Sequence, residues 1–192
     1  MHIGVAHHLG WAVVVAASGG GEVVDRRRIK LIDDDLPAAP IHHRGGAHPM
    51  HDDGDPLDDA ALSELAASVR ASATENVDRS FDALAADLEA PIESISLRDW
   101  PDDFPSDIAV LRRAPFESQA DSVMYRQVMA DAAAGRGWRV HRFDAKRVEA
   151  DAIGLVGDAD TLVAPRSNLG APWNADHRVA FAATIVAARR PA

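Results

Sequence analysis

The residues of this chain best suited to chemistry are a pair of histidines near its start. The segment IGVAHHLGWAVVVA, residues 3–16, is an apolar strand that reaches His7, His8 and a glycine before a second apolar run begins. Imidazole suits Mn²⁺, Fe²⁺ or Zn²⁺ as a ligand. On an extended strand the two rings point to opposite faces, so at most one of them can reach a shared site. The alternative is a hydrogen-bonded histidine at a strand end, with no ligand role.

A second group of histidines lies in a polar connection. Seven of the nine histidines fall within residues 1–51, and the stretch IHHRGGAHPMHDDGD, residues 41–55, places four of them beside aspartates. Imidazole and carboxylate together favour transition metals such as Zn²⁺ or Ni²⁺. The spacing matches no defined site, so we interpret residues 33–56 as a solvated, mobile loop. Such a loop could also cover a site at the ends of the strands.

Basic side chains gather further along the chain, and Lys146 and Arg147 are the pair best placed in a turn to contact phosphate. The alternative is a solvated surface, because Asp144 interrupts the run. The chain has no cysteine, which excludes disulfides, thiolate zinc sites and cysteine nucleophiles.

Length and charge limit the classes of protein to consider. The 192 residues fit one domain, residues 1–192, with a sizeable core. The net charge is −10, and it is uneven: residues 1–106 carry 20 acidic and 8 basic residues, whereas residues 107–192 carry 10 and 12. This balance counts against a nucleic-acid binder, although the second half could present a basic patch. Without an export signal or a long apolar run, we expect a cytoplasmic protein that does not enter membranes.

The hydrophobic pattern predicts a mixed α/β sheet. Two apolar strands and a third, charged strand over residues 22–32 form a hairpin or meander around the glycines of SGGGE. Asp55 and Pro56 look like the start of a long amphipathic helix over residues 57–89. A strand over residues 92–100 follows, and residues 107–113 are either a strand or a helical turn. A helix that begins at about Ala120 and ends at Gly135 or Gly137 comes next. A strand over residues 138–144, two short elements and a last helix from about Asn174 complete the chain.

This order, with three local patterns, resembles the ribonuclease H-like superfamily, in particular its RuvC-like, Holliday-junction-resolvase-like branch. The first pattern is IGVAHHLGWAVVVA followed by GEVVDRRRIKLI. The second is ADSVMYRQVMADAAAGRGWRVHRFDAKRV, and the third is NADHRVAFAATIVAA at the last helix. The resemblance covers most of the chain in outline and implies one ribonuclease H-like domain.

Enzymes of that superfamily cleave phosphodiesters with two divalent cations, which carboxylates from distant segments hold together. The resemblance puts the first-strand ligand at Ala6 or His7, neither of which is acidic. The fourth-strand ligand becomes Asp99, or Arg112 or Arg113 if residues 107–113 are that strand. The last-helix ligand becomes Asp176.

From these positions we expect Asp99 and Asp176 as catalytic residues and His7, Asp99, Asp176 and His177 as metal ligands. Lys146 and Arg147 are the expected substrate-binding residues, and Mg²⁺ or Mn²⁺ is the implied cofactor. The predicted function is a divergent metal-dependent phosphodiesterase acting on nucleic acid with an altered metal site. The alternative is a non-catalytic binding or regulatory module on the same fold, which the missing carboxylates favour.

Overall fold

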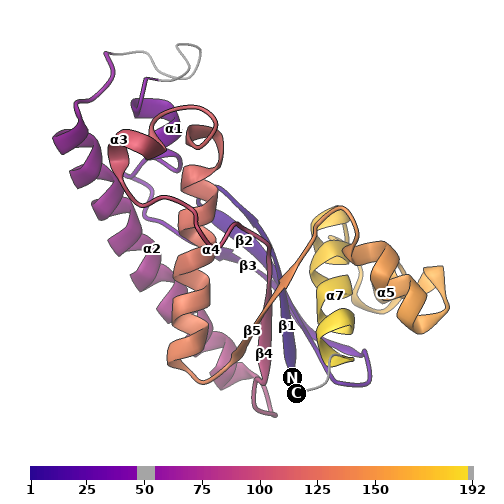
Figure 1. Cartoon of the computed structure of the whole chain (residues 1–192). Coiled ribbons are helices and arrows are strands. Elements are labelled where there is room, and N and C mark those ends of the chain that lie inside the picture. Colours follow the sequence, from indigo (N-terminus) through magenta and orange to yellow (C-terminus); the bar gives the residue numbers. More distant parts are fainter. Residues whose placement is uncertain (47–54, 190–192) are drawn as a thin grey trace.

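The computed structural model describes residues 1–46 and 55–189, which form one mixed sheet between two helical layers (Figure 1). The strands are β1 (His2–His8), β2 (Trp11–Ala17), β3 (Val23–Lys30), β4 (Ser94–Arg98) and β5 (Arg139–Phe143). The helices are α1 (Pro40–Arg44), α2 (Asp59–Asp87), α3 (Ile108–Leu111), α4 (Glu117–Gly135), α5 (Val148–Val156), η1 (Ala159–Leu162), α6 (Pro165–Leu169) and α7 (Ala175–Ala188). Within the described ranges, no helix is long and apolar enough to cross a membrane.

The sheet has the strand order β3-β2-β1-β4-β5. The first three strands form an antiparallel meander, and β4 and β5 run parallel to β1. Parallel neighbours need crossover connections, which α2 and α4 supply. An antiparallel meander followed by helix–strand alternation in this order is the ribonuclease H-like arrangement. The α/β fold class expected from the sequence is confirmed.

Each face of the sheet buries its own apolar core. Along β2, Ala12, Val14 and Ala16 pack toward α2 and α4, whereas Val13 and Val15 pack toward α7. This alternation follows from the two-residue period of a strand. On β1 the same rule sends Ile3 and Val5 toward α2 and α4 and leaves Gly4, Ala6 and His8 on the α7 face.

Several element boundaries differ from the sequence-based expectation. Helix α2 begins after Asp58, whose carboxylate accepts a hydrogen bond from the Ala61 N–H at 2.8 Å, so Asp58 and not Asp55 caps it. Residues 108–111 are helical, which leaves β4 as the fourth strand. Residues 40–44, inside the expected loop, form α1, because the Asp121 carboxylate accepts hydrogen bonds from the N–H groups of Ile41 and His42.

Candidate functional site

Glycine at position 4 lets α7 lie directly on β1. A Cβ at Gly4 would lie 2.7 Å from the carbonyl carbon of Ala180 in α7 and nearer still to its oxygen. On the neighbouring strand, the Ser96 hydroxyl donates a hydrogen bond to the carbonyl of Ala183 at 3.3 Å. These contacts put the first turn of α7, which contains Asp176, near the carboxyl end of β1.

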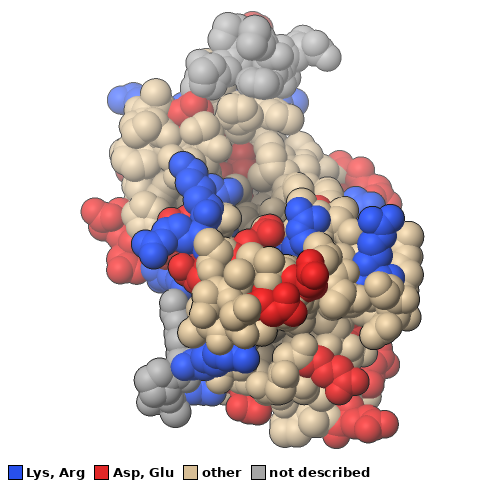
Figure 2. All heavy atoms as spheres, turned by 90° about the vertical axis from the view of Figure 1, so that its right-hand side faces the viewer, with Lys and Arg blue, Asp and Glu red and all other residues tan. Residues whose placement is uncertain are grey.

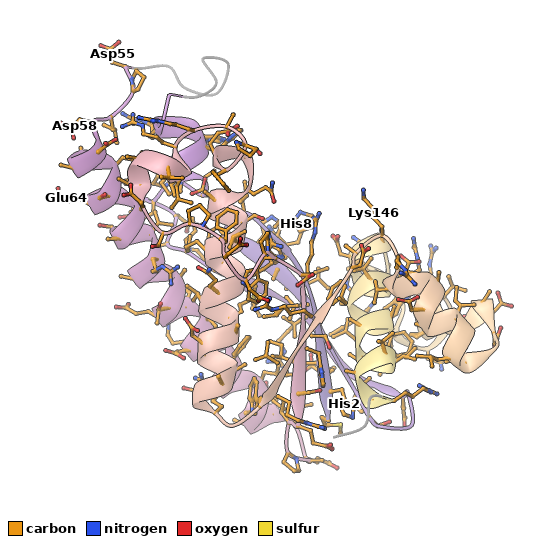
Figure 3. All side chains as sticks on the ribbon, in the orientation of Figure 1. His2, His8, Asp55, Asp58, Glu64 and Lys146 are labelled. Atoms are coloured by element: carbon orange, nitrogen blue, oxygen red, sulfur yellow. The ribbon has the colours of Figure 1, made fainter. Side chains whose placement is uncertain are left out.

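His8 and Asp176 meet at this point. The His8 Nε2 lies 3.1 Å from Oδ1 of Asp176, and the two side chains are 44% and 27% exposed. Figure 3 shows His8 between the two helical layers, at the opposite end of β1 from His2. The pair forms a solvent-accessible imidazole–carboxylate contact on the α7 face of the sheet.

Trp11 extends this contact across the sheet toward β3. The His8 ring stacks on the Trp11 indole with centroids 4.0 Å apart and an angle of 11° between the planes. The Arg28 guanidinium lies 4.1 Å from the indole centroid. Because β1 and β3 flank β2 on opposite sides, the indole lies between the imidazole and the guanidinium. Trp11 and Arg28 also line a pocket of about 510 Å³ at the end of β2 and β3.

Arg98 is the last residue of β4, and its Cα has the register of the α7 face. By strand alternation it shares this face with Ser94 and Ser96, the second of which contacts α7. Arg98 is exposed, and no hydrogen bond or ion pair joins its guanidinium to another residue of the described segments. The carboxyl end of β4 therefore carries an exposed guanidinium, and its positive charge also acts on His7 and Arg126 on the α4 side.

His7 lies on the other face, toward α4. Two of the groups that act on its pKa, Ser122 and Arg126, belong to α4. Desolvation by burial, followed by the positive charges of Arg126 and Arg98, lowers the pKa of His7 to about 3. His7 is therefore neutral at physiological pH. It is His8, and not His7, that contacts Asp176.

Asp99 also turns away from Asp176. Its Oδ1 lies 3.7 Å from Nη1 of Arg142, and its main-chain carbonyl accepts a hydrogen bond from buried Arg126. Arg142 stacks on Trp100 at 4.0 Å and forms a closer ion pair with Asp102. Asp99 thus belongs to a cluster of charged and aromatic residues on the α4 side of β4.

His177 closes the first turn of α7. In a capping box, the Asn174 side chain accepts a hydrogen bond from the His177 N–H, and Nδ1 of His177 accepts one from the Asn174 N–H. His177 is 6% exposed, and desolvation lowers its pKa. The contacts of this side chain therefore serve the helix terminus.

Lys146 and Arg147 occupy the turn between β5 and α5. Lys146 is exposed, and Figure 3 shows it pointing away from the protein beyond α7. Arg147 is the N-cap residue of α5, and Nη2 lies 3.7 Å from Oδ1 of Asp151. Figure 2 shows the α5 and α7 side, where basic groups are separated by acidic and uncharged residues.

The residues present do not fit a two-Mg²⁺ centre. Such a centre needs several carboxylate oxygens around ions that lie close together. Among the residues that the structure describes, no group of three or more His, Cys, Asp or Glu side chains could hold a metal ion. The α7 face offers the Asp176 carboxylate and the His8 imidazole, with Arg98 at the carboxyl end of β4. Of the histidine-rich loop, His48, His51, Asp52 and Asp53 lie outside the described residues.

Sequence reasoning missed three features of this site: the contact of His8 with Asp176, the position of Arg98, and Arg26. The Arg26 guanidinium donates hydrogen bonds to the carbonyls of residues 169–172, the loop that leads into α7. The sequence did contain a signal for Arg26, because strand alternation places Arg26 and Arg28 on one face of β3. Nothing in the sequence identifies the loop that Arg26 contacts.

Comparisons with known proteins identify no family for the chain. No protein-family model matches it, and none of the curated proteins does. Among solved structures, it is similar to that of RuvC from Thermus thermophilus, with 15% sequence identity and a TM-score of 0.45, over 96% of this chain and 90% of that chain. The strand order and strand directions of the sheet are what give this chain its ribonuclease H-like fold.

Proposed function

We propose that this chain is a divergent, RuvC-like member of the ribonuclease H-like superfamily that binds a nucleic-acid strand without cutting it. The binding site is the α7 face of the sheet at the carboxyl ends of β1 and β4. The observation that carries the proposal is Arg98, an exposed guanidinium at the carboxyl end of β4 with no hydrogen bond or ion pair to another described residue. A guanidinium is a strong, bidentate ligand for a phosphate group.

Three further groups support a strand-shaped ligand at this place. Arg28 is an exposed cation whose guanidinium lies 4.1 Å from the centroid of the Trp11 ring. Lys146 is exposed on the turn after β5. His8 is 44% exposed, and its N–H can be donated to a phosphate oxygen in exchange for its contact with Asp176. Together they offer a line of cationic and hydrogen-bonding groups from β5 to β3, long enough for more than one phosphate.

The net negative charge of the whole chain limits its affinity for nucleic acid. With a net charge of −10, the protein repels nucleic acid at long range, so the local cations must act at short range. For a single strand and about three neutralised phosphates, the slope of log K against log salt is about −2. We therefore expect weak binding that is measurable at low salt.

The test is fluorescence anisotropy of a labelled 20-nucleotide single strand in buffer of low ionic strength. Arg98→Gln should weaken binding at least about fivefold, because one bidentate phosphate contact is removed. The control is Arg139→Gln, which removes the same charge at the other end of the sheet, where Arg139 pairs with Ser94 and lies 3.8 Å from Glu93. Equal weakening by the two variants, or no binding by the wild type, would overturn the proposal.

A second candidate is the metal-dependent phosphodiesterase, and the contact of His8 with Asp176 favours it. Two donor atoms of types that Mn²⁺ accepts lie 3.1 Å apart on the face where the superfamily resemblance implies the metal. Strand cleavage that requires Mn²⁺ and is lost in Asp176→Asn would establish this candidate and exclude the binding module.

A further inference from the structure

A pocket on the other side of the molecule, far from the strand ends of the α7 face, lies between α2 and α4. It has a volume of about 410 Å³, within the usual range for small-molecule sites. From α2, four residues line it at the spacing i, i+3, i+4, i+7, which is one helix face: Ser63, Ala66, Ala67 and Arg70. Small side chains in the first three positions keep this wall of the pocket open.

Helix α4 supplies the facing wall with the same spacing. Its residues in the pocket are Ala120, Val123, Met124 and Gln127. Two parallel series therefore face each other, with alanine or serine at the start of each and a polar residue at the end. The Arg70 Nη2 donates a hydrogen bond to Oε1 of Gln127 at 2.9 Å, which joins the two helices across that end of the pocket.

The segment before α4 forms the remaining side. Phe104, Ile108 and Leu111 line the pocket, and each is partly exposed. No residue of α3 is buried, although three of its four residues are isoleucine, valine and leucine. Apolar surface in a hollow of this size is what a ligand with an apolar body would cover.

The polar end of the pocket selects the charge of that ligand. Arg70 has no ion pair with a carboxylate among residues 1–46 and 55–189, and its one side-chain hydrogen bond is to the neutral Gln127 amide. A guanidinium fixed by an amide at the rim of an apolar hollow is complementary to a carboxylate.

We propose that this pocket binds a small apolar carboxylic acid, with its hydrocarbon part between α2 and α4 and its carboxylate on Arg70. The site is independent of the strand-end site, so either can fail without the other. An effector or cargo acid of this class would contact both long helices on one side of the sheet.

The experiment uses decanoate as the probe and decanol as its uncharged counterpart, with calorimetry for affinity and the ¹³C-methyl resonance of Met124 for location. Wild-type protein should bind decanoate at micromolar concentration, shift the Met124 resonance, and bind decanol about tenfold more weakly. Arg70→Gln should lower the affinity of the protein for decanoate to its affinity for decanol. Arg79→Gln, on the same helix outside the pocket, should leave both unchanged.

A filling substitution tests the location independently of charge. Ala67→Leu adds three carbons to an exposed helix position that lines the pocket, so it should abolish decanoate binding in a folded protein. Ala71→Leu makes the same change at an exposed α2 position outside the pocket and should have no effect. Decanoate binding that survives Ala67→Leu, equal affinity for decanol, or an unmoved Met124 resonance would each overturn the proposal.

Discussion

The close approach of α7 to β1 leads to a prediction that compares the stability of Gly4→Ala with that of Gly154→Ala. In Gly4→Ala, the new Cβ would lie 2.7 Å from the carbonyl carbon of Ala180, whereas ordinary contacts lie at 3.4–4 Å. Helix α7 would have to move by at least about 0.7 Å, and more to clear the carbonyl oxygen. In Gly154→Ala, no atom lies within 4 Å of the new Cβ, and the position is inside α5.

The two substitutions should therefore have opposite signs. Overpacking a filled site costs about 1–3 kcal/mol and occasionally more. Because backbone of a buried helix is the obstacle at Gly4, we expect a loss of about 3 kcal/mol in the free energy of unfolding. Replacing an open helix glycine with alanine recovers about 0.5–1 kcal/mol.

Urea unfolding followed by circular dichroism measures both effects. With a slope of about 2 kcal/mol per molar urea, Gly4→Ala should lower the midpoint by about 1.5 M, whereas Gly154→Ala should raise it by about 0.3 M. A change of less than 0.5 kcal/mol for Gly4→Ala would refute the packing of α7 on β1. The position of Asp176 beside His8 would then lose its structural basis.

Three other substitutions test parts of the same structure. The pKa of His7 is lowered to about 3, so the unfolded chain binds a proton that the folded chain does not between pH 6.5 and about 3. Stability should fall as the pH drops through that range, and His7→Gln should remove this part of the slope in urea titrations at pH 4.5 and 7. Arg26→Met should cost about 2 kcal/mol and speed cleavage after Leu169, as limited chymotrypsin digestion would show. Tyr125→Phe removes the hydrogen bond of the hydroxyl to the carbonyl of Ala38 and should cost about 1 kcal/mol by thermal unfolding.

The sequence was sufficient for most of the fold because local patterns coincide with its elements. The apolar, β-branched run in residues 11–17 and the periodicity of the long helix predicted β2 and most of α2. The hairpin-first order of the elements predicted the mixed α/β sheet. Asn174 marked the start of α7 correctly because its side chain satisfies an N–H of the first turn.

The face of each side chain could not be predicted with the same success, because a shift of one residue along a strand reverses the face. His7 and His8 are adjacent, yet only His8 reaches Asp176. Arg98 and Asp99 are also adjacent; strand alternation gives Arg98 the register of the α7 face, whereas Asp99 lies near Arg142. The expectation of a carboxylate ligand selected Asp99 from the second pair. The strand register, and not the residue type, decides which of the two positions lies toward α7.

Helix α1 was missed for a different reason. Its five residues have no side-chain cap of their own, and the carboxylate that satisfies the N–H groups of Ile41 and His42 belongs to Asp121, in another helix. Asp121 is 3% exposed, and burial raises its pKa to about 6. Such long-range capping leaves no local signal in the sequence.

The most direct test of the central claim compares strand binding with and without a divalent metal. Anisotropy titrations of the labelled single strand would be run in EDTA and in Mn²⁺, with wild type and Arg98→Gln, and the strand would be recovered on a denaturing gel. We expect the same affinity in EDTA and in Mn²⁺, weaker binding by Arg98→Gln in both, and an intact strand. Binding only in Mn²⁺, with a cut strand, would contradict the account and assign the site to metal-dependent cleavage.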